Sequence, residues 1–401
     1  MDNQLLLSLV EKYGAPLYVY DANKIEQQYN RMRNAFSGVK NVKINYAIKS
    51  NTNINILKVL NRLKSGTDCV SIQEVKLCIH AGFDVENISY TPNGVSYDEL
   101  VEAKNLGVKI TLDNLSSLKQ FGTDFPDYPV AIRMNPHVMA GGNAKISVGH
   151  IDSKFGVSVS QIDLILKVVS DTGMTINGVH MHTGSDISNL EAFVEATEIL
   201  LGIAKQFDTI EFIDLGSGFK VPYKPGDNET DLEQLGVLLG DSFNQFCREY
   251  GKELTLVFEP GKFLVSESGK FLATVNVIKE TPNITFAGID SGLNHLSRPM
   301  MYDAYQHITN ISNTSEEKDE YSVVGYICET DTFGSKRILS KVSQGDVLCI
   351  HNAGAYCFSM ASNYNSRFKP AEVMIYNGVD YLIRKRENMD DILKNQVEIS
   401  F

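Results

Sequence analysis

Short β-rich apolar runs alternate with helical runs over the first two thirds of the chain. The first helical run repeats apolar residues at i, i+3, i+4 and i+7 from Ile56, which places them on one helix face. The eight β-rich runs are 42–47, 67–70, 88–91, 108–112, 130–134, 176–182, 210–214 and 254–258. Eight strand–helix alternations over ~220 residues predict an α/β fold, a parallel (β/α)8 TIM-like barrel. A doubly wound open sheet has the same alternation, so spacing alone leaves it as a competitor.

After about residue 266 the pattern changes to strands with little helix between them. The runs that read as strands are 271–279, 321–327, 347–350 and 373–384. The last contains Asn377-Gly378, a strong hairpin signal. Residues 16–20 also read as a strand, and we expect this strand to join the same sheet. We therefore expect a β/α barrel over 25–265 and an all-β domain built from 1–24 and 266–401.

Polar residues indicate where helices begin and where the chain turns. Ser71 and Ser96 each have a glutamate three residues later, the pattern of a capping box. Asp113 is a further candidate cap, and Asn135-Pro136 is a candidate turn. Residues 314–320 are charged and polar and are predicted to form an exposed loop.

Composition limits the binding partners and the cellular compartment that we expect for this protein. The net charge of -12 argues against nucleic acid, because phosphate binding needs clustered Lys and Arg. None of the six cysteines forms a CxxC pair, so neither a zinc site nor a disulfide framework is predicted. The first residues lack a basic signal region, and no apolar stretch reaches the ~18 residues that span a bilayer. We expect a cytoplasmic protein with no membrane or nucleic-acid partner.

Lys49 is the most informative residue. It ends the first β-rich run, and Asn51 then opens a helical run, so Lys49 is expected at the C-terminal mouth of a strand. In β/α enzymes the chemistry lies there. A desolvated amine loses its proton more easily and forms a Schiff base with a carbonyl or with pyridoxal phosphate. The alternative is a solvated surface lysine.

Other polar residues follow the remaining strands, and a barrel would bring them to the same end. They are Asp68, Ser71, Asn93, Asp113, Arg133, Asn135, His180, His182, Gly216, Ser217, Gly218 and Glu259. The turn at 216–218 fits a single phosphate better than a dinucleotide, because its small residues let N–H groups approach an anion. His180 and His182 share a strand face, which suits either a metal with a third ligand or a ring packed over a flat cofactor; we expect no metal. Glu259 either keeps a pyridine nitrogen protonated or caps a loop.

Seven blocks occur in the order of a known family. They are Tyr-Ala-Ile-Lys-Ser-Asn at 46–51, Gly-Val-His-Met-His-Thr-Gly-Ser at 178–185, Asp-Leu-Gly-Ser-Gly-Phe at 214–219, Glu-Pro-Gly-Lys at 259–262, Arg-Pro-Met-Met-Tyr at 298–302, Cys-Glu at 328–329, and Gly-Ala-Tyr at 354–356 running on to Ser-Met-Ala-Ser-Asn-Tyr-Asn at 359–365. With these blocks the chain resembles the fold type III pyridoxal-phosphate decarboxylases, and within them the diaminopimelate decarboxylase branch. The resemblance implies an alanine racemase-like barrel plus a β-domain, pyridoxal 5'-phosphate as cofactor, and a homodimer with active sites shared between subunits.

The resemblance also implies roles for matching residues. Lys49 would hold the cofactor as a Schiff base, His182 would stack on its ring, and Glu259 would pair with its nitrogen. Cys328 would sit across a dimer interface and return a proton to the substrate carbon. The residues implied for the phosphate are Ser185, Gly216, Ser217, Gly218 and Tyr356. The residues implied for the substrate are Arg298, Tyr302, Glu329, Lys262 and Tyr356.

The chain departs from the family pattern in three places. Ser217 stands where the family usually has a third glycine, so its side chain must point away from the phosphate or donate to it. Lys262 replaces the usual arginine, so a bidentate pair of hydrogen bonds to an anion is replaced by a point charge. Thr330-Asp331-Thr332 replaces Ser-Gly-Asp, so Asp331 is displaced by one position and receives no role.

The implied reaction is decarboxylation of meso-2,6-diaminopimelate to L-lysine and CO2, the last step of lysine biosynthesis. A substrate with a far amine and a far carboxylate needs both an acid and a base at its distal end, and Glu329 and the pair Arg298/Tyr302 supply them. The alternatives are a decarboxylase of carboxynorspermidine, ornithine, lysine or a specialised-pathway diamino acid, and a non-catalytic decarboxylase-like regulator. Such a regulator should have lost Lys49 or Cys328, and both are present.

Overall fold

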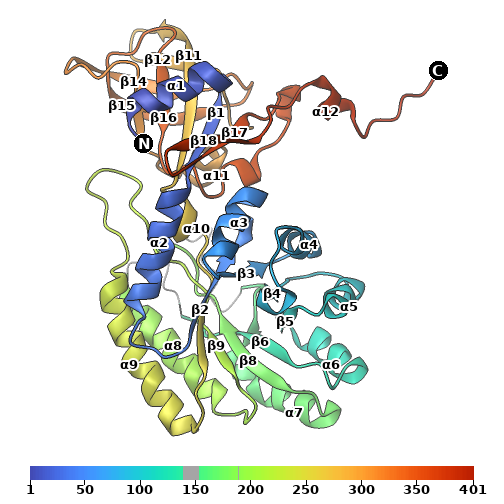
Figure 1. The fold of residues 1–401 in the computed structure, drawn as a ribbon. Helices are drawn as coiled ribbons and strands as arrows, with labels where there is room; N and C mark the ends of the chain where they lie inside the picture. The colour runs from blue at the N-terminus through green and yellow to red at the C-terminus, as the bar shows by residue number, and fades with distance from the viewer. Residues whose placement is uncertain (139–152, 188) are drawn as a thin grey trace. The chain divides into compact units, whose positions relative to one another are not determined.

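A computed structural model describes residues 1–138, 153–187 and 189–401, and Figure 1 labels their helices and strands. The chain divides into two compact units. The barrel unit comprises residues 26–221 and 228–264. The β-unit comprises residues 1–25, 222–227 and 265–401. Among the described residues, no helix combines the length and the apolar character needed to cross a membrane.

The barrel unit contains a closed ring of parallel strands. Its eight strands are β2 (Val42–Ala47), β3 (Gly66–Cys69), β4 (Ile88–Tyr90), β5 (Lys109–Leu112), β6 (Val130–Asn135), β8 (Ile176–Met181), β9 (Phe212–Asp214) and β10 (Thr255–Phe258). Neighbours pair in chain order, β10 pairs with β2, and the β5–β6 pairing closes the ring. The short β7 (Val157–Ser158) pairs with β6 outside it. The predicted barrel is confirmed, and the open sheet is excluded.

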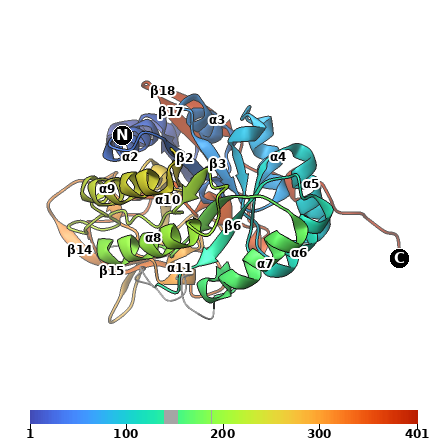
Figure 2. The same cartoon turned by 90° about the horizontal axis from the view of Figure 1, so that it is seen from below.

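Helices surround the ring, as the view in Figure 2 shows. They are α2 (Ala22–Ala35), α3 (Ile54–Arg62), α4 (Ile72–His80), α5 (Tyr97–Leu106), α6 (Leu115–Asp124), α7 (Ile162–Thr172), α8 (Leu190–Ala204), α9 (Leu232–Tyr250) and α10 (Lys262–Val265). Strands covered by helices are buried on both faces, and every residue of β6 is buried. This explains why the apolar runs located the strands so closely.

The predicted helix caps are partly right. Ser71 and Ser96 each accept a hydrogen bond from the backbone N–H three residues on, as predicted. The two capping boxes are wrong, because the carboxylate of Glu74 accepts from Val70 N and that of Glu99 accepts from Ile72 N. The cap of α6 is Asn114 rather than Asp113. The predicted turn at Asn135 is supported by a 3.0 Å hydrogen bond from the N–H of His137 to Asn135 Oδ1.

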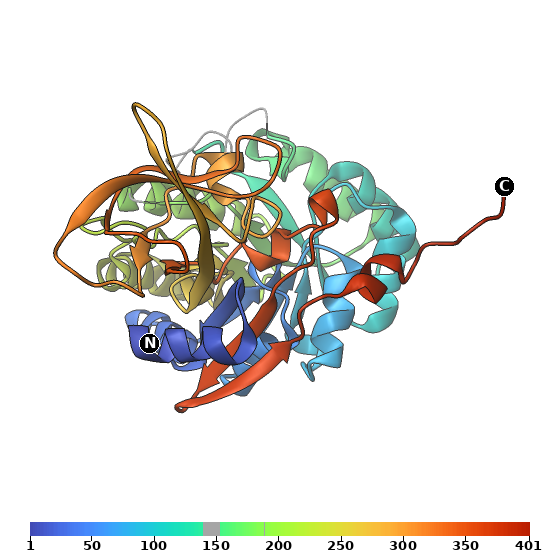
Figure 3. The ribbon, with the colours of Figure 1, turned by 90° about the horizontal axis from the view of Figure 1, so that it is seen from above.

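The β-unit is built around one sheet that includes the N-terminal strand. Its strands are β1 (Leu17–Asp21), β11 (Gly269–Glu280), β12 (Thr285–Ile289), β13 (Ile308–Asn310), β14 (Lys318–Val324), β15 (Thr332–Ser340), β16 (Val347–Ile350), β17 (Ala371–Tyr376) and β18 (Val379–Arg384). β1 pairs antiparallel with β11 and parallel with β17, so the predicted use of the N-terminal strand is confirmed. Figure 3 shows this blue strand beside the red hairpin β17–β18.

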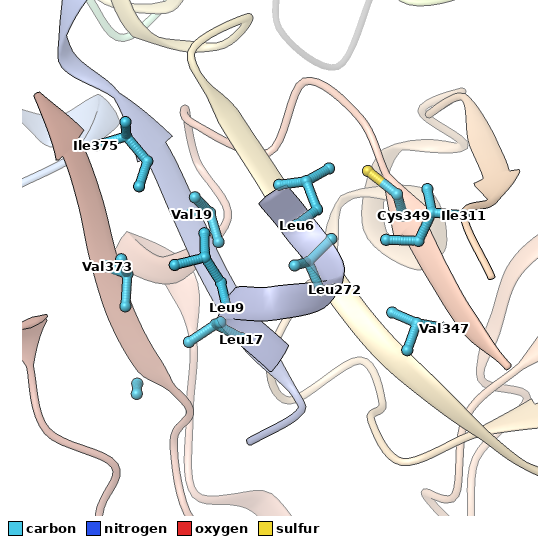
Figure 4. Close-up of a cluster of buried hydrophobic side chains, with 11 residues drawn as sticks. Leu6, Leu9, Leu17, Val19, Leu272, Ile311, Val347, Cys349, Val373 and Ile375 are labelled. Carbon is cyan, nitrogen blue, oxygen red and sulfur yellow. The ribbon is translucent and has the colours of Figure 1, made fainter. Parts of the chain in front are cut away.

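Three strands and three helices of the β-unit have no counterpart in the prediction. β12, β13 and β15 were missed, and β14 begins at Lys318, inside the predicted exposed loop. The helix α1 (Asn3–Tyr13) buries Leu6 and Leu9 against the sheet, in the cluster drawn in Figure 4. At about 2 kcal/mol for each fully buried leucine, these contacts hold the N-terminus on the β-unit. The short helices α11 (Arg298–Tyr302) and α12 (Met389–Leu393) complete the unit.

Candidate active site

Lys49 lies just after β2, at the C-terminal end of the ring. It belongs to a 3-10 turn, Ile48–Ser50, and Asn53, not Asn51, caps the helix that follows. Its Nζ lies 3.0 Å from Oδ2 of Asp68, a buried residue of β3. The Lys49 side chain is 40% exposed. The predicted position after the strand is therefore right, and the amine is partly exposed and has a carboxylate partner.

Glu259 follows β10 and pairs with His180 of β8, with 3.0 Å between Oε2 and Nε2. Burial alone would raise the pKa of Glu259, but the attraction of His180 and Lys49 outweighs it and holds this pKa at about 2. The second carboxylate oxygen, Oε1, is buried and has no hydrogen-bond partner among the described residues. A buried acceptor of this kind fits a protonated ring nitrogen.

Further buried charges surround Glu259. Asp214 ends β9, and burial together with the nearby Glu259 raises its pKa well above the ordinary value. Burial and Glu259 likewise raise the pKa of Asp68. Burial lowers the pKa of the Arg133 guanidinium. Among these three buried carboxyl groups, Glu259 is therefore the one whose pKa is lowered rather than raised.

His180, Asp214 and Glu259 bring ligand atoms within 4.8 Å of one another. In this group, Nε2 of His180 already contacts Oε2 of Glu259 at 3.0 Å. The two histidines that invited a metal have different partners, because Nδ1 of His182 accepts from Ser217 N at 3.4 Å. The absence of a metal stays a prediction.

His182 suits packing against a flat ring. Burial, followed by the charges of Arg133 and Lys49, lowers its pKa to about 3, so the imidazole is neutral. Since Nδ1 accepts a hydrogen bond, the ring proton is assigned to Nε2.

The turn at 216–218 packs closely on the segment that follows β8. A Cβ on Gly216 would lie 2.5 Å from the carbonyl oxygen of Met181, and one on Gly218 would lie 2.1 Å from that of Gly184. Gly218 also has a φ of +131°, a conformation that other residues rarely adopt. The backbone N–H of Gly216 donates to Asp214 at 2.8 Å. Ser217 is buried, and its N–H faces His182 rather than an open space.

Ser185 and Asp186 lie in the loop that this turn contacts. Ser185 is partly buried. Asp186 has a φ of +61° and forms an ion pair with Lys262, whose side chain is 10% exposed. The lysine in the usual arginine position thus has an acidic partner, a contact that the sequence analysis missed.

The remaining predicted residues belong to the β-unit. Arg298 begins α11, and its guanidinium carbon lies 5.9 Å from the ring centre of Tyr356 and 5.4 Å from that of Tyr223. Tyr302 ends the same helix and is partly buried. Tyr356 has a φ of +56°, a strained backbone of the kind found at functional sites.

Cys328 and Glu329 lie exposed in the loop between β14 and β15. Asp331, which had no predicted role, is buried and fastens this loop. Its carboxylate accepts from Leu293 N at 2.6 Å and from Ile327 N at 3.1 Å.

Within the barrel unit, the predicted residues Lys49, His182, Glu259 and those of the turn at 216–218 follow neighbouring parallel strands and share one end of the ring. Their chemistry fits pyridoxal phosphate: an amine, a neutral ring, a charged acceptor with a spare oxygen, and a turn whose two glycines leave no room for a Cβ. The contacts that the sequence analysis missed involve Asp68, Asp214 and Asp186. Asp214 precedes the glycine turn in a block that matched the family, which was a usable signal.

Comparisons with known proteins identify the family of the chain. The family described as "Pyridoxal-dependent decarboxylase, pyridoxal binding domain" matches residues 22–266. The chain is 38% identical over 400 residues to diaminopimelate decarboxylase of Methanothermobacter thermautotrophicus, covering 97% of this chain and 93% of that protein. It is 33% identical to the Haemophilus influenzae enzyme of the same name, covering 96% and 94%.

A solved structure of a protein with the same name has the same fold. Diaminopimelate decarboxylase from Helicobacter pylori complexed with L-lysine superimposes with a TM-score of 0.89 at 31% identity, covering 97% of this chain and 98% of that one. The chain belongs to the pyridoxal-dependent decarboxylases, enzymes whose cofactor is pyridoxal 5'-phosphate.

Proposed function

We propose that this protein converts meso-2,6-diaminopimelate to L-lysine and CO2, the last step of lysine biosynthesis. The observation that carries the proposal is the match to diaminopimelate decarboxylases along nearly the whole chain, including the H. pylori enzyme complexed with L-lysine. It extends beyond the barrel to the β-unit, which holds the residues predicted for the distal end of the substrate.

In this proposal the barrel residues bind and orient the cofactor. Lys49 holds it covalently through Nζ, and Asp68 keeps that amine in place until the cofactor arrives. His182 packs on the ring, and Glu259 keeps the ring nitrogen protonated through Oε1 while His180 fixes Oε2. When bound, the cofactor supplies an electron sink for the charge left on the substrate carbon after CO2 is lost.

The phosphate in this proposal is held by backbone N–H groups and by hydroxyl side chains. Ser185, Ser217 and Tyr356 donate to it, and Gly216 and Gly218 let the backbone come close. Lys262 adds a positive charge that it shares with Asp186. A phosphate can accept hydrogen bonds from several such donors at once.

In this proposal, residues of the β-unit determine substrate specificity and carry out the last proton transfer. Arg298 and Tyr302 bind the distal carboxylate, Glu329 binds the distal amine, and Cys328 returns a proton to the substrate carbon through Sγ. The proximity of Arg298 to Tyr356 supports a common site for these two side chains.

We also propose a cytoplasmic homodimer whose active sites are shared between subunits, with 25–265 as the cofactor-binding barrel and the flanking segments as the β-domain. If sites are shared, mixing the inactive variants Lys49→Ala and Cys328→Ala restores part of the activity, since hybrids contain one intact site. Mixtures that exchange subunits and remain inactive would contradict sharing.

The test of the function is lysine formation. Purified protein supplied with pyridoxal phosphate is expected to show a visible absorbance band and to form L-lysine from meso-diaminopimelate. Lys49→Ala should abolish both, whereas Lys40→Ala, a change at an exposed lysine paired with Glu253, should abolish neither. A protein that never binds pyridoxal phosphate would refute the proposal.

A further inference from the structure

The exposed pair Cys328–Glu329 is contacted by another pair of consecutive residues, Tyr364–Asn365, from a distant part of the β-unit. Nδ2 of Asn365 donates to Sγ of Cys328 at 3.4 Å. Oδ1 of the same amide lies 3.7 Å from Sγ, where it accepts the S–H. The Tyr364 hydroxyl donates to Oε1 of Glu329 at 2.9 Å and lies 3.9 Å from Sγ.

A carboxamide matches a thiol in both of its protonation states. While Sγ carries its proton, Oδ1 of Asn365 can accept it and thereby orient the S–H bond. After Sγ gives the proton away, the thiolate is an acceptor, and Nδ2 donates to it. A carboxylate at the same place could serve only the first state, and an apolar side chain could serve neither.

The backbone around Asn365 is shaped for this contact. Asn365 and Ser366 have φ values of 55° and 54°, in the left-handed region that costs non-glycine residues free energy. This double left-handed step interrupts the 3-10 turn Tyr364–Ser366. Asn tolerates this conformation better than most residues do.

The hydroxyl of Tyr364 contacts this thiol, and Glu329 accepts the hydrogen bond that the same hydroxyl donates. The hydrogen bond to Glu329, and then the one to Cys328, raise the pKa of Tyr364 to about 12. The phenol therefore stays neutral and does not compete for the proton that Cys328 carries.

We propose that Asn365 is a positioning residue that holds the Cys328 thiol and stabilises it after proton loss, and that Tyr364 orients Glu329. The role for Cys328 in turnover rests on the function proposed above. The contacts themselves do not, and they can be tested on protein without cofactor.

The experiment measures alkylation of Cys328 by iodoacetamide across pH 6 to 10. All six cysteines are described, and Cys328 alone is exposed. Cys247, which is partly buried, is removed by Cys247→Ser in every sample. Two variants keep the left-handed backbone: Asn365→Gly deletes the amide, and Asn365→Asp keeps its shape without the N–H donor. Ser366→Gly is the matched control one residue on.

Both Asn365 variants are expected to alkylate at least about fivefold more slowly at pH 7.5, because the thiolate loses a charge-assisted hydrogen bond. The midpoint of the pH dependence should move upward in both, and Ser366→Gly should match the parent protein. In turnover, Asn365→Gly should lower kcat with little change in KM.

Superimposable alkylation profiles for the parent protein and both Asn365 variants would overturn the proposal. So would an equal shift in Ser366→Gly, since the effect would then be one of backbone alone. Alkylation is measured without cofactor or substrate. An inactive parent protein would therefore count against the proposed function, but the alkylation rates would still test the contact between Asn365 and Cys328.

Discussion

Gly218→Ala is expected to weaken cofactor binding without unfolding the barrel. The new Cβ would lie 2.1 Å from the carbonyl oxygen of Gly184, whereas such atoms normally stay about 3.2 Å apart, so the backbone must move by about 1 Å. The loop cannot give way alone, because Ile187 N donates to Gly218 O at 2.8 Å. A misplacement of about 1 Å can cost about 100-fold in the rate of a reaction, and we take this as the upper bound for the loss of affinity. We therefore expect the Kd for pyridoxal phosphate to rise about 10- to 100-fold, which is about 1.4 to 2.7 kcal/mol.

The assay is titration of cofactor-free protein with pyridoxal phosphate, and in parallel with pyridoxal, which lacks the phosphate. The phosphate-bearing ligand should lose far more affinity than pyridoxal. Gly202→Ala in α8 is the matched control, because nothing lies within 4 Å of its built Cβ. That control should bind normally and gain up to about 1 kcal/mol of stability from better helix propensity. Unchanged affinity in Gly218→Ala, or equal losses for both ligands, would refute the phosphate assignment.

Three further predictions concern the charges of the site. Glu259→Gln should lower kcat about 100-fold, since it removes the charge opposite the ring nitrogen. Glu253→Gln, at the other end of β10, is the control and should leave kcat unchanged. Equal kcat values for the two variants in steady-state kinetics would contradict the role of Glu259. His182 has a pKa of about 3 in the folded protein against 6.5 ordinarily, so between these pH values the unfolded chain binds a proton that the folded chain does not. The free energy of unfolding of cofactor-free protein should therefore fall with decreasing pH in this window, by at most about 1.4 kcal/mol per pH unit, and urea titrations of His182→Gln should show a shallower fall; an unchanged slope would contradict a neutral His182. Arg298→Ala should raise KM for diaminopimelate more than for lysine or ornithine, and a uniform rise would remove Arg298 from the distal site.

The apolar pattern predicted the barrel well for a physical reason. Strands covered by helices are largely buried, so most of them appear as short runs richer in apolar residues than the segments between them. β15 was missed because it is an edge strand of the β-unit sheet, and residues 335–336 at its centre are exposed and polar. A strand of this kind has no pattern to separate it from a loop.

The positions of single site residues could be predicted from the sequence, but the contacts between pairs of them could not. Lys49 could be placed at a strand end, yet its partner depends on strand register, which sets Ala47 of β2 beside Asp68 of β3. The ion pair of Lys262 with Asp186 joins residues 76 positions apart. Such contacts arise from tertiary packing, and no local spacing encodes them.

The most direct test of the central claim is CO2 release from a panel of amino acids by the cofactor-loaded protein. The panel contains meso-diaminopimelate, lysine, ornithine, arginine and carboxynorspermidine. We predict that kcat/KM for meso-diaminopimelate exceeds that for each of the others by at least about 100-fold, the scale expected when buried polar groups of the site lose their partners. A higher kcat/KM for any other member of the panel would contradict the proposed function.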